Sequence, residues 1–206
     1  VLITTKQGKT GKPSVTVSAN VTFSTLAREI PMLGTKDYID FRNAKEFIGE
    51  DGTPMTMDGI LSVNWQKEAT RTAVSQNYRA SVSGKSQKTT YYLALGYSDQ
   101  QGVIRKTGVD KYDIRLNLDQ EINDRISLKT TSAFSSINTS MTSGTDKLAN
   151  TRTSIVRHMI SFKPYKGVSS GDDYANYDED LTSPEAWFTD YDDDSKENTF
   201  NTNVSL

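Results

Sequence analysis

The chain has 206 residues, with 24 lysines and arginines against 26 aspartates and glutamates and a formal net charge of -2. This balance argues against a nucleic-acid-binding protein, which carries a basic footprint, and the absence of cysteine excludes a disulfide scaffold or a thiolate metal site. The sequence contains no run of about 18 apolar residues, which a transmembrane helix would need. A membrane β-barrel stays compatible with the sequence, because its strands need only about 10 alternating residues.

The first predicted strand, residues 13–25, alternates without a break. Its odd positions are apolar and its even positions are serine, threonine or asparagine; the apolar set is Val15, Val17, Ala19, Val21 and Phe23. A strand of period two shows these two sets to different environments. A soluble sheet would place the apolar set on a protein core, whereas a membrane barrel would place it against lipid and the polar set in a wet lumen.

The two ends of the chain indicate an internal fragment of a longer protein. The sequence opens directly on the apolar run VLITTK, and it stops at Leu206 while NTFNTNVSL is still alternating. Near the start, Gly8–Lys12 imitates a phosphate-binding loop, but the spacing between the glycine and the Gly-Lys pair is too short and a strand follows instead of a helix. We expect a turn there.

Between the first and second strands the pattern changes to helical spacing. Residues 35–47 predict a short helix, with Asp37 in its first turn. Residues 49–59 are rich in glycine, aspartate, proline and methionine and predict a turn region, and residues 65–72 predict a second helical turn.

Five further alternating runs follow. The predicted strands lie near 76–84, 89–98, 111–122, 126–136 and 199–206. Residues 140–197 are polar, acidic and irregular, with one predicted helix near 146–159. The connections alternate between long and short, so in an antiparallel sheet every long loop would lie at one end. Outer-membrane barrels have this asymmetry, with short periplasmic turns and long extracellular loops.

Aromatic residues add to this pattern, because they lie toward the ends of the predicted strands. The set is Phe23, Tyr78, Tyr91, Tyr97, Tyr112 and Phe134. A membrane barrel places an aromatic girdle at each lipid interface, although aromatic residues are also common in strands of soluble proteins.

Three segments resemble SusC/RagA-type TonB-dependent outer-membrane transporters. VLITTKQGKTGKPSVTVSANVTF (1–23) resembles the junction between plug and barrel, NWQKEATRTAVSQNYRASVSG (64–84) resembles the W-x5-R-T-A-x2-Q segment that opens the second strand, and residues 88–128 resemble the next two strands. The segments occur in the order of the family and lie within residues 1–128, a span of more than half of the chain. Their joint occurrence is the specific signal.

The resemblance implies an all-β fold: an antiparallel sector, about six strands wide, of a transmembrane outer-membrane β-barrel of the 22-strand class, with long extracellular loops that carry short helices. Residues 1–12 would be the C-terminal end of the plug domain and residues 13–206 the N-terminal part of the barrel. The alternative from the residues alone is a soluble extracellular β-sandwich that binds carbohydrate.

The function implied by the resemblance is import across the bacterial outer membrane of oligosaccharides, or of peptides. Its implied partners are a SusD-like surface lipoprotein as a lid, the TonB complex as an energy source, and outer-membrane lipid, with no nucleic acid. Such a protein breaks no substrate bond, so we expect no enzyme, no catalytic residue and no cofactor.

Binding residues are predicted only in the long loops. Trp65, Trp187 and Tyr191 with Asp190 combine flat aromatic faces and a carboxylate, which suits sugar rings; packing within the loops is the simpler interpretation. Asp192, Asp193 and Asp194 are weak candidates for a structural Ca²⁺ site, because hard oxygen ligands suit calcium but the regular D-x-D-x-D-G loop is absent. His158, the one histidine, has no second histidine or cysteine near it and is interpreted as structural or exposed.

Overall fold

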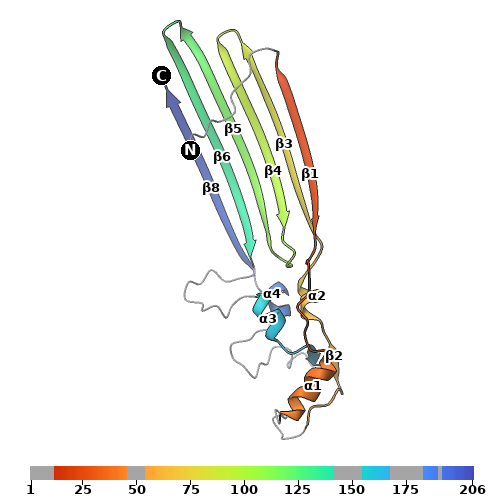
Figure 1. The fold of residues 1–206 in the computed structure, drawn as a ribbon. Helices are drawn as coiled ribbons and strands as arrows, with labels where there is room; N and C mark the ends of the chain where they lie inside the picture. Colours follow the sequence, from red (N-terminus) through yellow and green to blue (C-terminus); the bar gives the residue numbers. More distant parts are fainter. Residues whose placement is uncertain (1–11, 46–53, 142–154, 168–182, 190–191) are drawn as a thin grey trace.

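The computed structural model describes residues 12–45, 54–141, 155–167, 183–189 and 192–206. They form one long antiparallel sheet with a cluster of short helices at one of its ends (Figure 1). The sheet strands are β1 (Ser14–Ser24), β3 (Ala73–Ser86), β4 (Thr89–Gln101), β5 (Gly108–Asn123), β6 (Ile126–Met141) and β8 (Asp193–Ser205). The cluster contains α1 (Thr35–Ala44), β2 (Ile60–Ser62), α2 (Trp65–Ala69), α3 (Ile155–Ser161), β7 (Tyr165–Gly167) and α4 (Pro184–Thr189).

The six long strands pair in the order β1-β3-β4-β5-β6-β8, and each pair is antiparallel. Residues 87–88 and 124–125 make the two short turns at one end of the sheet, whereas the connections β1–β3, β4–β5 and β6–β8 meet at the other end (Figure 1). The predicted asymmetry between short turns and long loops is confirmed.

The strand register brings all apolar rows onto one face. Val82 lies opposite both Val15 and Leu93, and Leu93 lies opposite Leu116. In the neighbouring row, Ala80, Leu95, Ile114, Phe134 and Phe200 are successive partners across β3, β4, β5, β6 and β8. Because cross-strand partners share a face of a sheet, the apolar rows of the separate segments combine into one apolar surface, which Ser132 on β6 and Thr202 on β8 interrupt.

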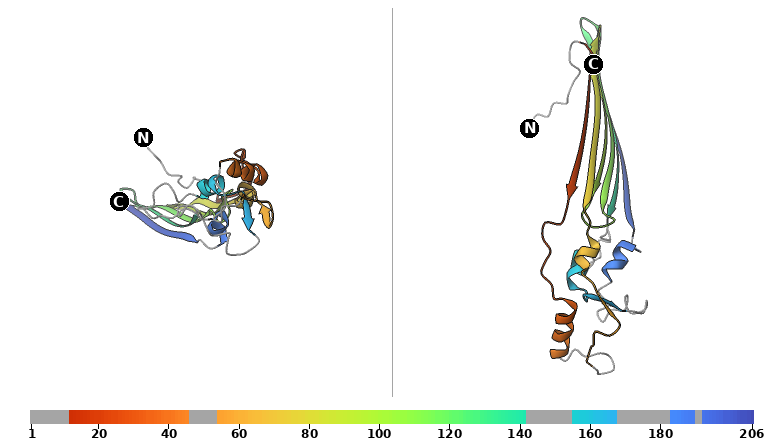
Figure 2. Two further views of the ribbon diagram at one scale, coloured as in Figure 1. Left: turned by 90° about the horizontal axis from the view of Figure 1, so that it is seen from below. Right: turned by 90° about the vertical axis from the view of Figure 1, so that its right-hand side faces the viewer.

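This apolar surface is open. Figure 2 shows the sheet edge-on as a single layer, and no second sheet packs on either face among the residues that the structure describes. Val17 is 73% exposed and Leu95 is 47% exposed. A soluble sandwich would bury these side chains between two sheets, so the described fold departs from the sandwich alternative and matches a sector of an outward-apolar barrel.

The opposite face is polar and carries a groove. Arg79, Lys111, Asp113 and Arg115 line it together with small serine, threonine and alanine side chains, and its volume is about 790 Å³. Gly96 lies between Arg79 on β3 and Asp113 on β5, and a Cβ atom at Gly96 would lie 2.6 Å from the Asp113 carboxylate oxygens. The glycine thus lets the Asp113 carboxylate lie across β4.

The strands β3, β4, β5, β6 and β8 extend beyond the predicted residues, mainly at the loop end, whereas β1 has nearly its predicted extent. Residues such as Ser75, Asp99, Asp110 and Asn138 continue the backbone ladder, although their polar side chains end the hydrophobic alternation from which the strands were predicted. The predicted turn 85–88 narrows to Gln87 and Lys88, with Gln87 in the left-handed region at φ 48.

The helix predictions are confirmed in kind, with bounds that differ from those predicted. The first helix, α1, ends at Ala44, and its Asp37 and Arg42 lie at the ends where they complement the helix dipole. The predicted turn at 65–72 forms α2, and the predicted helix at 146–159 begins at Ile155 within the described residues. The sequence did not predict α4, β2 or β7, which are too short to show a period.

Candidate functional site

The loop cluster has an interior of its own. Buried side chains from α2 and α3, with Phe162 just beyond α3, form its core: Trp65, Ala69, Ile155, Met159 and Phe162. Asn64 begins α2, because its side-chain oxygen accepts a hydrogen bond from the Lys67 N–H at 3.2 Å. The ring of Trp65 meets that of Phe162 edge-on, with the centroids 5.7 Å apart. Ile104 of the β4–β5 connection packs against this core, which thus joins three connections that are distant in the sequence.

Backbone and side-chain hydrogen bonds join the first connection to the third. The indole Nε1–H of Trp65 donates to the Lys163 carbonyl at 2.7 Å, and the Val63 N–H donates to the Pro164 carbonyl at 3.0 Å. The Thr35 hydroxyl donates to the same Pro164 carbonyl at 2.7 Å. Together with the pairing of β2 and β7, these bonds fix residues 60–65 against residues 163–167.

Arg71 joins the first connection to the second. Its guanidinium donates to the carbonyls of Gly102 and Thr107, each at 3.1 Å, and its backbone N–H donates to the Val103 carbonyl at 2.8 Å. The Arg105 N–H returns a bond to the Ala69 carbonyl at 2.9 Å. The Arg71 side chain therefore binds both the first and the last residue of the β4–β5 connection.

Charged pairs complete the cluster at its surface. Lys106 donates to the Asp192 carboxylate at 2.7 Å and to the Thr189 carbonyl at 3.2 Å, which links the β4–β5 connection to the end of α4. Lys166 on β7 pairs with Glu185 on α4. On α1 the ammonium group of Lys36 donates a hydrogen bond to the Asp40 carboxylate. This bond and the negative charge of the carboxylate raise the pKa of Lys36.

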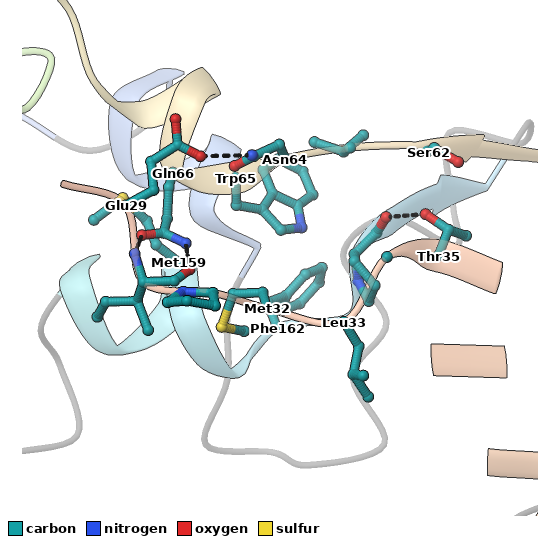
Figure 3. Close-up of a pocket in the computed structure, with 15 residues that line it drawn as sticks. Glu29, Met32, Leu33, Thr35, Ser62, Asn64, Trp65, Gln66, Met159 and Phe162 are labelled. Carbon is teal, nitrogen blue, oxygen red and sulfur yellow. Dashed lines mark hydrogen bonds between the residues drawn. The ribbon is translucent and has the colours of Figure 1, made fainter. Parts of the chain in front are cut away.

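A pocket of about 690 Å³ opens between the extended segment 29–35 and the cluster core (Figure 3). Trp65 faces this space from α2, and Met32 and Phe162 lie on its other side (Figure 3). The Gln66 side chain holds the segment in place, because its oxygen accepts from the Ile30 N–H and its nitrogen donates to the Ile30 carbonyl, both at 2.8 Å.

The predicted ligand residues fall in different places. Trp65 is 3% exposed and lines the pocket with part of its ring, and Trp187 packs against the cluster core and meets the ring of His158 at 5.2 Å. The structure does not bring the two tryptophans together as one open platform. Asp190 and Tyr191 lie outside the described residues. His158 is buried, in agreement with a structural role.

The aspartates proposed for calcium do not converge. Asp192 pairs with Lys106, and Asp193 and Asp194 are successive strand residues, whose side chains point to opposite faces. In the described ranges, no three acidic or histidine side chains are grouped to hold a metal ion. The calcium site stays a prediction that also involves acidic residues outside these ranges.

Gln66 and Arg71 were not predicted as site residues. Both lie in the W-x5-R-T-A segment. The signal that could have identified them is that they are polar residues near the buried positions Trp65 and Ala69 of α2. Gln66 binds backbone groups 36 residues away and Arg71 binds a carbonyl 31 residues away. Local sequence spacing cannot predict such partners.

None of the helices in the described part of the chain is long and apolar enough to cross a bilayer. The exposed apolar surface described above lies on the strands of the large sheet.

No family model matches the chain, but individual proteins do. The TonB-dependent receptor SusC of Bacteroides thetaiotaomicron is 30% identical over 119 residues, which are 57% of this chain and 12% of SusC. The TonB-dependent receptor P26 of Formosa agariphila is 31% identical over 131 residues, which are 61% of this chain and 13% of that receptor. The chain therefore spans about an eighth of the length of these relatives.

Solved structures agree on the fold. The structure of the RagAB peptide transporter matches with a TM-score of 0.69 and 20% sequence identity over 97% of this chain and 27% of the matched chain. The RagAB peptide importer in its closed-closed state gives a TM-score of 0.67. Sequence and fold together confirm the resemblance to SusC/RagA-type receptors, and the six-stranded sheet matches a sector of their barrel.

Proposed function

We propose that the chain is the first part of the barrel wall of a TonB-dependent outer-membrane importer of the SusC/RagA type. Its apolar face would contact lipid, its polar face would line the lumen, and its loop cluster would stand at the extracellular mouth. The similar proteins are named as receptors and an importer, and none is named as an enzyme.

One observation supports this proposal most directly: on β3, β4 and β5 a row of tyrosines follows the exposed apolar residues toward the loop end. Tyr78, Tyr97 and Tyr112 are cross-strand partners on that face, with ring centroids 6.4 and 4.8 Å apart. One row nearer to the loops, the same three strands carry Gln76, Asp99 and Asp110. On these strands apolar side chains are followed by aromatic and then by polar or charged ones, which is the order expected where a strand passes from lipid to water.

The finer parts of the proposal rest on the family resemblance. The ligand would be an oligosaccharide or a peptide, a SusD-like lipoprotein would cap the mouth, and TonB would supply the energy through regions beyond this chain. Residues 1–12 would be the end of the plug. Trp65, Trp187, Asp190 and Tyr191 are the loop residues proposed to approach the ligand, and Asp192–Asp194 the weak calcium candidates.

The direct test is the location of the whole parent protein. Expressed at full length, it should fractionate with outer membranes and migrate faster on a denaturing gel before boiling than after, as a closed barrel does. A monomer that stays in solution without detergent would contradict the proposal.

Single cysteines test the orientation, since the chain contains no cysteine of its own. In a cysteine-free full-length protein, Leu61→Cys in the loop cluster should react on intact cells with a membrane-impermeant maleimide. Asp124→Cys, in the short turn, should react only after the outer membrane is opened. The reverse labelling pattern would overturn the assigned topology.

A further inference from the structure

The pocket in the loop cluster differs from a sugar site in how its polar side chains are used. Sugar recognition needs donors and acceptors that are left for hydroxyl groups, beside an open aromatic face. Here the indole N–H of Trp65 donates to Lys163, both ends of the Gln66 amide are bonded to Ile30, and the Thr35 hydroxyl donates to Pro164.

Asn64 completes this set. Its oxygen caps α2 by accepting from the Lys67 N–H, and its nitrogen donates to the Glu29 carboxylate at 3.0 Å. The polar groups of the lining are thus largely committed to the fold. A hydroxyl-rich ligand entering this space would lose hydrogen bonds to water and find few replacements, which disfavours its binding.

Apart from Ser62, the other side chains that line the pocket are apolar. Its wall is made of Pro31, Met32, Leu33, Trp65, Met159 and Phe162. Methionine side chains are flexible and polarizable and adapt to ligands of differing shape. The volume of about 690 Å³ exceeds that of a single side chain, so it suits an aliphatic or aromatic group together with the chain that carries it.

The rim adds one charge. Glu29 accepts the Asn64 bond through one carboxylate oxygen, and a carboxylate with two oxygens keeps further acceptor capacity. A cation next to an apolar group would match this arrangement, because the carboxylate attracts it while the wall takes the apolar part. Among polymeric nutrients, a peptide carries both groups within one or two residues.

We propose that this pocket binds an apolar side chain of a peptide whose neighbouring lysine, arginine or amino terminus pairs with Glu29. The inference rests on the proposed function, because it assigns the ligand class of an extracellular mouth, and it makes the peptide the ligand in preference to the oligosaccharide at this site.

The test uses the full-length receptor, purified in detergent, and isothermal titration calorimetry with maltotriose and three tripeptides, each acetylated at its amino terminus so that the lysine side chain is the only cation. Leu-Leu-Lys should bind more tightly than Ser-Ser-Lys, which lacks the apolar groups, and than Leu-Leu-Glu, which reverses the charge. Met32→Glu should weaken Leu-Leu-Lys binding about tenfold, since it places a charge in the apolar wall. Glu29→Gln should weaken it about threefold and abolish the preference over Leu-Leu-Glu.

Matched controls separate the pocket from the surface around it. Leu61 is 61% exposed against 47% for Met32 and does not line the pocket, so Leu61→Glu should leave peptide binding unchanged. Glu68→Gln, on the exposed side of α2, is the control for Glu29→Gln. Far-UV circular dichroism and heat-modifiable migration should be the same for all four variants.

Three results would overturn the inference: equal affinity for the three tripeptides, equal loss of binding in Met32→Glu and Leu61→Glu, or maltotriose binding that weakens in Met32→Glu while peptide binding does not. None of these concerns the barrel. A receptor that fractionates with the outer membrane and shows heat-modifiable migration, but fails the peptide test, would overturn only the pocket assignment.

Discussion

The sheet and the loop cluster of this chain use apolar residues in opposite ways. In the cluster, Trp65, Ala69 and Ile155 are buried against one another, whereas on the sheet Val17, Leu95 and Ile114 stay exposed. The cluster therefore holds its own hydrophobic core, whereas the sheet presents an apolar surface that the described residues leave exposed. The proposed function assigns this surface to lipid and the cluster to water.

The first prediction tests whether the cluster is stable through its own core. In the full-length protein, Trp65→Ala should destabilise the cluster by about 3–5 kcal/mol, because it leaves a cavity and removes the bond to Lys163. Hydrogen exchange measured by mass spectrometry should show lost protection in 155–167, with protection kept in β4 and β5.

The control for that experiment is Leu61→Ala, which removes an exposed side chain of the same cluster and should change little. Equal loss of protection in β4 and β5 would show that the cluster and the sheet unfold as one unit, and the contrast between the two regions would then fail.

The second prediction tests the lipid-facing assignment. Leu95→Arg should reduce the free energy of unfolding of the barrel in lipid by about 2–4 kcal/mol, the cost of a basic side chain at mid-bilayer on the outer face. Ser81→Arg lies in the adjacent row on the polar face and should cost much less. Denaturant titration of folded protein in vesicles measures both, and equal costs would contradict the assignment of the two faces.

The contrast between the regions also explains what the sequence could predict. The strands were predictable because the two faces of the sheet differ in polarity at every second residue, so Val15 to Phe23 shows the pattern within one segment. The strand ends were not, because Ser75 and Asp110 continue the ladder through backbone bonds alone, and those bonds do not depend on the type of side chain.

The site was less predictable for a related reason. Trp65 was a candidate ligand residue, with packing within the loops as the simpler interpretation, and the structure buries it beside a hydrogen-bond partner 98 residues away, the Lys163 carbonyl. Gln66 likewise binds the backbone of Ile30, which any residue type could supply. Contacts to backbone groups across long loops depend on tertiary structure, and periodicity carries no information about them.

The third prediction concerns the link between the first and second connections. Arg71→Met should cost about 1–3 kcal/mol, since it removes charge-assisted bonds to the Gly102 and Thr107 carbonyls. Hydrogen exchange should rise in residues 102–107 and stay unchanged in β6. Arg105→Met, an exposed arginine in the same connection, is the matched control, and a similar rise in that variant would argue against a specific role of the Arg71 guanidinium.

The smallest effect is expected from the surface pair that joins the second connection to the third. The side chain of Lys106 is 34% exposed and that of Asp192 is 74% exposed, so solvent screens their attraction and the pair should contribute no more than about 1 kcal/mol. A double-mutant cycle with Lys106→Met and Asp192→Asn, read by exchange in 102–107, measures the coupling. Because the Debye length falls to about 3 Å in 1 M salt, the coupling should vanish there. A coupling that persists in high salt would mean that the loop cluster shields this pair from water, which would extend its buried interior as far as the start of β8.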